Sequence, residues 1–103
     1  MVPDLSQING IEDYTKKPDQ DRELYYVKTN SGEDKVFLVI NKHTIEFRTD
    51  EKLANVLKEK YESVMESRYF GRAGLELVPA GQLTDEEIED LIRLSYRLSK
   101  EDK

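Results

Sequence analysis

The sequence has no cysteine and a single histidine, His43. Without cysteine the chain has no disulfide framework, no thiol nucleophile and no thiolate zinc site. A lone histidine beside a predicted turn is typical of a surface residue, since a metal site usually needs several ligands. The GxGxxG, P-loop, HExxH and GxSxG motifs are absent too. We therefore expect no enzyme, no catalytic residue, no metal and no cofactor.

Long apolar runs are also missing. The longest is Val36–Ile40, with five residues, whereas a membrane-spanning helix needs about 20. Residues 1–9 contain no basic stretch followed by an apolar one, so they do not resemble a secretory signal. We expect no membrane partner and a cytoplasmic location.

Positive charge is in deficit, with 16 Lys and Arg against 22 Asp and Glu, a net charge of −6 over 103 residues. Such a chain does not coat nucleic acid or an anionic membrane through its overall charge. The negative charge is distributed unevenly. Residues 83–103 carry seven acidic and four basic residues, which accounts for half of the net charge. A small basic patch elsewhere on the surface stays compatible with this balance.

The acidic residues near the C-terminus have a structural explanation. Thr84 and Glu87 form a capping box that predicts the start of a terminal helix. The predicted buried face of this helix has helical spacing: Ile88, Leu91, Ile92, Ser95, Tyr96 and Leu98. The acidic cluster comprises Asp85, Glu86, Glu87, Glu89 and Asp90. These carboxylates could gather a hard cation, but we favour their role in offsetting the positive end of the helix dipole.

Residue patterns predict one α+β domain after a less regular N-terminal segment. Residues 1–22 combine turn-forming residues with apolar positions three apart, which predicts weak structure or a short helix. Residues 23–103 form the domain. Leu24–Thr29 and Lys35–Ile40 predict a hairpin around five turn-forming residues. His43–Arg48 adds a third strand and completes an antiparallel meander.

Alternation and helical spacing orient the remaining elements. In the third strand Ile45 and Phe47 should face the core, and Glu46 should face water. A helix is predicted from Thr49 or Asp50 to about Tyr61. Its predicted apolar stripe consists of Leu53, Val56, Leu57 and Tyr61. With a later strand or hairpin around residues 75–77, the expected fold is an antiparallel sheet packed against two helices.

One segment interleaves basic and aromatic residues without a carboxylate, namely Ser67–Gly74. Its two arginines could meet phosphates, and its two rings could stack or wedge against bases. The same residues would also suit an ordinary loop whose rings anchor in the core and whose arginines are solvated. Lys42, His43 and Arg48 form a second basic group on the preceding hairpin.

Four segments in order carry a family resemblance: Lys35–Phe37, Ile45–Ala54, Ser67–Arg72 and Gly81–Tyr96. Together they resemble the MmcQ/YjbR family in a lysine-led strand, a strand entering an acidic helix start, an arginine-aromatic loop and a closing helix. The sequence departs from that pattern in two places. Gly71-Arg72 stands where the family usually has Asn-Lys, and Leu75 stands where it has tryptophan.

The resemblance implies a YjbR-like domain over residues 23–103 with a frataxin-like (CyaY-like) fold and a double-wing arrangement proposed to bind DNA. The DNA-contacting residues that it implies are Lys42, Arg48, Arg68, Tyr69 and Arg72, with Lys28 as a further phosphate contact and Phe70 shaping the loop. Binding should be weak and salt-sensitive, because few phosphates could be neutralised. The alternative is a protein-interaction or chaperone-like module without catalytic activity, whose acidic surface favours a basic partner.

Overall fold

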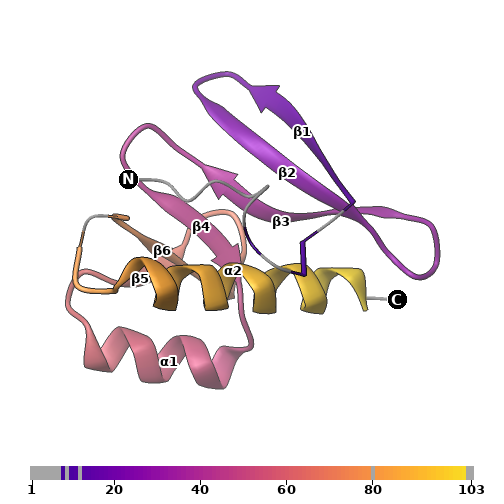
Figure 1. Ribbon diagram of the computed structural model, residues 1–103. Helices are drawn as coiled ribbons and strands as arrows, with labels where there is room; N and C mark the ends of the chain where they lie inside the picture. The colour runs from indigo at the N-terminus through magenta and orange to yellow at the C-terminus, as the bar shows by residue number, and fades with distance from the viewer. Residues whose placement is uncertain (1–7, 9, 12, 80, 102–103) are drawn as a thin grey trace.

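A computed structural model of the protein describes residues 8, 10, 11, 13–79 and 81–101 (Figure 1). These residues form six strands and two helices: β1 (Tyr14–Asp19), β2 (Arg22–Lys28), β3 (Asp34–Ile40), β4 (Ile45–Arg48), α1 (Glu51–Lys60), β5 (Met65–Ser67), β6 (Gly71–Leu77) and α2 (Asp85–Lys100). The strands make one antiparallel sheet in the order β1-β2-β3-β4-β6-β5. The predicted α+β fold, with an antiparallel sheet packed against helices, is confirmed.

Strand β1 corrects the prediction for the N-terminal segment. Residues 14–19 are not weakly structured or helical but pair with β2, from Tyr14 opposite Val27 to Asp19 opposite Arg22. They lie at a sheet edge, where lysines and proline are tolerated, so the strand lacks the apolar alternation that identifies strands in a sequence. Most of the predicted short helix lies outside the described residues, although Ile8 and Ile11 are buried in the core.

The helices α1 and α2 cover one face of the sheet (Figure 1). Directly paired residues of antiparallel strands point to the same face. The row that points toward the helices consists of Tyr25, Leu38, Phe47 and Leu75. These side chains form the core with Ala54 of α1 and with Ile88, Ile92 and Tyr96 of α2.

A bulge in β3 adds Phe37 to this core. Tyr25 pairs with Leu38 and Tyr26 with Val36, so Phe37 is the extra residue, and a bulge of this kind re-aims a side chain. The Phe37 ring lies edge-on to Tyr96, with 5.2 Å between the centroids. As a second consequence, Val36 and Tyr26 share the face opposite the helices.

The helices begin where the sequence predicts. Asp50 caps α1, and Thr84 and Glu87 form the capping box of α2. The predicted apolar stripe of α1 is wrong at Val56, which is 56% exposed. The helix packs instead through Ala54. Val56 comes two positions later and therefore lies about 200° further around the helix axis. Within the described part of the chain, neither helix is long and apolar enough to cross a membrane.

The opposite side of the sheet, here called the open face, carries Leu24, Tyr26, Val36, Val39, Glu46, Arg48 and Glu76. The prediction that Glu46 faces water is wrong, since this residue is 1% exposed and Glu76 is 4% exposed. Glu46 is covered by Ser67, which lies 21 positions later in the chain. Alternation within β4 therefore could not reveal the burial of Glu46.

We expect Ser95→Ala to lower the free energy of unfolding by about 1–3 kcal/mol, because it leaves two buried backbone groups unpaired. Ser95 Oγ donates to the Phe37 carbonyl oxygen at 2.6 Å and accepts from the Arg48 N–H at 2.7 Å, which ties α2 to β3 and β4. Urea denaturation measures the change.

Ser99→Ala is the matched control for this variant. Ser99 is equally buried on α2, but its Oγ lies 3.5 Å from the Val36 carbonyl oxygen. Equal losses from the two variants would contradict the bridging role of Ser95.

Candidate nucleic-acid interface

Two buried carboxylates lie directly opposite each other on the open face. Glu46 of β4 pairs in register with Glu76 of β6. Like charges in this position destabilise a sheet unless other groups compensate them. Among the described residues, no buried polar side-chain atom lacks a hydrogen-bond partner, so the compensation for both carboxylates can be traced.

Glu46 is compensated mainly by neutral hydrogen-bond donors. Its Oε1 accepts from Ser67 Oγ at 2.8 Å and from the Tyr69 N–H at 2.9 Å, and its Oε2 accepts from Asn41 Nδ2 at 2.8 Å. Burial raises the pKa of Glu46, but the bonds from Asn41, Tyr69 and Ser67, with the charge of Arg68, outweigh it. The pKa of Glu46 therefore lies below its ordinary value of 4.5.

Glu76 is compensated by a cation. Arg68 donates from Nε to Oε1 at 3.0 Å and from Nη2 to Oε2 at 2.9 Å, a two-point contact that suits a guanidinium and a carboxylate. Thr44 Oγ1 also donates to Glu76 at 2.8 Å. The Arg68 side chain is nevertheless 73% exposed, so its outer surface stays accessible to a ligand.

These bonds hold the β5–β6 loop, Arg68–Phe70, against the open face. Ser67 Oγ, bound to Glu46, also accepts from the Phe70 N–H at 2.9 Å. Gly74 leaves room for the loop, because a Cβ at that position would overlap the Phe70 Cβ and lie 3.1 Å from the Ser67 Cβ. The ordinary-loop interpretation of this segment is therefore only partly right: the loop is tied down by buried carboxylates.

Two open cavities lie on either side of Tyr69. The first, here called the turn cavity, has a volume of about 520 Å³ and is lined by Asp19, Gln20, Asp21, Arg22, Asn41, Lys42, Arg68 and Tyr69. The second, here called the aromatic cavity, has a volume of about 480 Å³ and is lined by Tyr26, Asp34, Lys35, Val36, Arg48, Tyr69, Phe70 and Ala73. Tyr69 lines both, so the cavities form one continuous surface.

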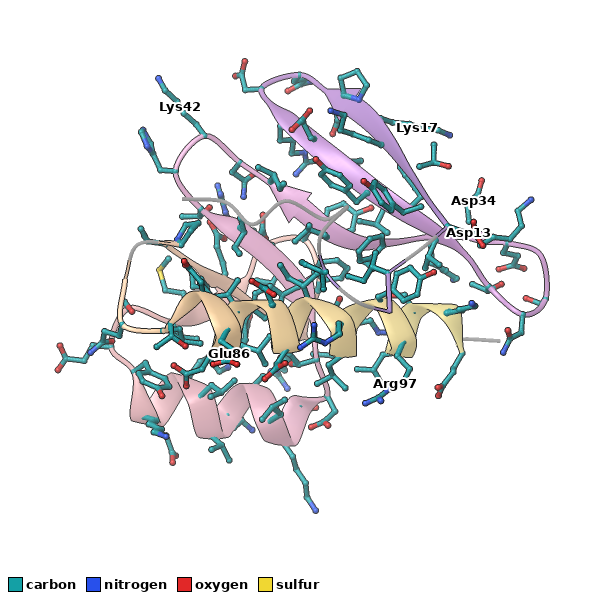
Figure 2. All side chains as sticks on the ribbon, in the orientation of Figure 1. Asp13, Lys17, Asp34, Lys42, Glu86 and Arg97 are labelled. Carbon is teal, nitrogen blue, oxygen red and sulfur yellow. The ribbon has the colours of Figure 1, made fainter. Side chains whose placement is uncertain are left out.

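The fold brings together four of the five residues singled out from the sequence. Lys42, Arg68 and Tyr69 line the turn cavity, and Arg48 lines the aromatic cavity with Tyr69. Figure 2 shows Lys42 projecting outward from the turn between β3 and β4. Arg72 is exposed on β6 and lines neither cavity.

Of the two accessory residues, Phe70 is half-buried and lines the aromatic cavity, whereas Lys28 is exposed at the end of β2 and lines neither. Sequence reasoning missed Arg22, Tyr26 and Lys35. Arg22 belonged to the segment expected to be irregular. Alternation along the strand could place Tyr26 on one face of the sheet, but it does not indicate what that face binds.

A cation lies over each of the two tyrosine rings of this surface, the half-buried Tyr26 and the exposed Tyr69. Lys17 Nζ lies 5.0 Å from the centroid of Tyr26, and Arg22 Cζ lies 5.6 Å from the centroid of Tyr69. Figure 2 shows Lys17 projecting from β1. Arg22 also forms an ion pair with Asp19 at 2.8 Å.

The charge of the surface differs from that of the chain. The cavities are lined by five basic and three acidic residues, and the buried Glu46 and Glu76 beneath them bring the sum to zero. The remainder of the protein therefore carries the whole net charge of −6. This surface is therefore close to neutral, and its cations are more exposed than the two buried glutamates.

The fold is similar to that of Deinococcus radiodurans protein DR2400, a crystal structure with a DUF419 domain. The TM-score is 0.73 at 13% sequence identity, over 91% of this chain and 71% of that one. This likeness shows a shared fold. DUF419 is a YjbR/MmcQ-like family, so the predicted resemblance is confirmed at the level of fold. No family model matches the sequence, and no curated protein matches it.

We expect Glu46→Gln to lower the free energy of unfolding at neutral pH by about 1–3 kcal/mol. The glutamine amide has no charge, and its NH₂ group would face the hydrogen-bond donors that surround Glu46. The pKa of Glu46 is lower in the folded protein than the unfolded value of 4.5, so its negative charge stabilises the fold. This stabilisation is complete above pH 4.5 and is lost as the pH falls through the pKa of the folded state. The difference between the wild type and this variant should therefore shrink below pH 4.5.

Urea denaturation over a pH series checks this expectation. Glu66→Gln is a control, since Glu66 is an exposed glutamate on β5 whose carboxylate lies 3.7 Å from Lys58 Nζ. A wild-type advantage over Glu46→Gln that stays constant down to the acid transition would contradict the assigned role of the Glu46 charge.

Proposed function

We propose that this protein binds DNA through the open face, with its cations on the phosphate backbone and with no catalytic role of its own. The observation that carries the proposal is the convergence of Lys42, Arg48 and Arg68 around Tyr69, from three separate turns and strands. Phosphate contacts of this kind hold a nucleic acid in place without reading its sequence.

The distribution of charge favours the open face over the helix side. The first turn of α2 presents Asp85, Glu86 and Glu87, which would repel a phosphate backbone. The helices leave the open face uncovered (Figure 1). A polyanion that approaches this acidic protein therefore meets exposed cations and no net negative charge on the side away from α2.

The affinity should be modest. Arg68 pairs with Glu76, and Arg22 pairs with Asp19, so a phosphate contact by either arginine competes with an internal ion pair. Few counterions are released when few phosphates are neutralised, which gives a shallow dependence on salt. The fold of a DUF419 domain is compatible with this role, although a fold does not determine a function.

A second candidate is binding of a protein partner. The specific observation is the exposed Val56 on α1, near a cavity lined by Asp50, Glu51, Lys52 and Leu53. A basic partner with an apolar contact would suit that site. This observation carries less weight than the converging cations, because single exposed apolar side chains are common on protein surfaces.

Fluorescence anisotropy with a labelled oligonucleotide, as single strand and as duplex, tests DNA binding at about 50 mM salt. We expect binding of at least one form at tens of micromolar protein. Lys42→Ala and Arg48→Ala should each weaken it and reduce the slope of log affinity against log salt by about one.

Arg97→Ala is the matched control, since Arg97 is an exposed arginine on α2 (Figure 2). It should leave both the affinity and the salt slope unchanged. Absence of binding to both forms, or equal effects of the open-face and α2 variants, would overturn the proposal.

A further inference from the structure

The open face offers more aromatic surface than phosphate binding requires. The aromatic cavity is lined by three rings, those of Tyr26, Tyr69 and Phe70, together with the apolar Val36 and Ala73. Tyr69 is 41% exposed, so its ring does not serve mainly to fill the core. The Tyr69 and Phe70 rings stand edge to face, with their centroids 4.9 Å apart.

Cations and rings alternate across this surface. Lys17 lies over the ring of Tyr26, Arg22 lies over the ring of Tyr69, and Arg48 lines the same cavity as both tyrosines. A nucleotide needs a flat apolar partner for its base and a cation for its phosphate, and the aromatic cavity is lined by both kinds of group. This pairing is the common device of proteins that bind single strands.

A duplex cannot use these rings in the same way. Its bases are stacked inside the helix, and its outer surface presents phosphates and groove edges. Only unpaired bases can turn outward and stack on aromatic side chains. A duplex on this face would therefore meet the cations and leave the aromatic cavity unused.

We infer that the open face selects single-stranded DNA, with unpaired bases in the aromatic cavity against Tyr26 and Tyr69 and the backbone along Lys42 and Arg48. The inference rests on the proposed DNA binding and adds the form of DNA that is bound. The Tyr69 N–H donates to Glu46, and Gly74 leaves room for the β5–β6 loop, so Tyr69 is in position before the DNA strand binds.

Three labelled ligands of one length test the inference with the wild-type protein: a single strand of about ten nucleotides, the duplex of that sequence, and a single strand of abasic nucleotides. The abasic strand keeps every phosphate and lacks the bases. We expect the single strand to bind about tenfold more tightly than either of the others, as expected for stacking of about one base.

Tyr69→Leu should weaken binding of the single strand about tenfold and leave its salt slope unchanged, because stacking adds no phosphate contact. Tyr61→Leu is the matched control. Tyr61 is half-buried after α1, with Lys60 Nζ 5.2 Å from its ring centroid, and its replacement should not alter the affinity. Circular dichroism verifies that both variants fold, and the abasic comparison stands without either variant.

The outcomes separate the inference from the proposed function. Equal, salt-dependent binding of all three ligands would overturn the selection of single strands and leave phosphate binding intact. Tighter binding of the duplex than of the single strand would likewise overturn the selection of single strands and leave phosphate binding intact. Absence of binding to all three would overturn both the inference and the proposed function.

Discussion

The placement of Glu46 directly opposite Glu76 is the constraint on which the rest of the open face depends. Two buried carboxylates on neighbouring strands require donors and positive charge nearby. Ser67 at the end of β5 and the β5–β6 loop, through the Tyr69 N–H and Arg68, supply these. The loop is thereby bound to the sheet, and Tyr69 lines both the turn cavity and the aromatic cavity.

The same arrangement explains how an acidic chain presents cations on a nearly neutral surface. The carboxylates are turned inward and satisfied by hydrogen bonds, whereas the Arg68 side chain that neutralises Glu76 is 73% exposed. Negative charge is concentrated elsewhere, notably in the first turn of α2, where it offsets the helix dipole. Net charge thus describes the protein poorly, and the burial of particular charges decides which face a polyanion can approach.

Local signals made β2, β3, β4, α1 and α2 predictable, since alternation, turn residues and caps act within a few positions. Strand β1 was missed because an edge strand with Lys16, Lys17 and Pro18 has no apolar alternation. The burial of Glu46 was missed because its cover comes from Ser67, 21 positions later. The basic and aromatic residues of the site were visible in the sequence, but their convergence around Tyr69 depends on the path of the β5–β6 loop over the sheet.

The central claim is that the face organised by Glu46 and Glu76 is the ligand-binding surface. Titration of the isotope-labelled protein with a short single-stranded oligonucleotide, followed by amide chemical shifts, tests it most directly. The account predicts shifts that cluster on β2, on β4 and on the β5–β6 loop, with the Tyr69 amide among the largest. Shifts confined to α1 and α2 would contradict it.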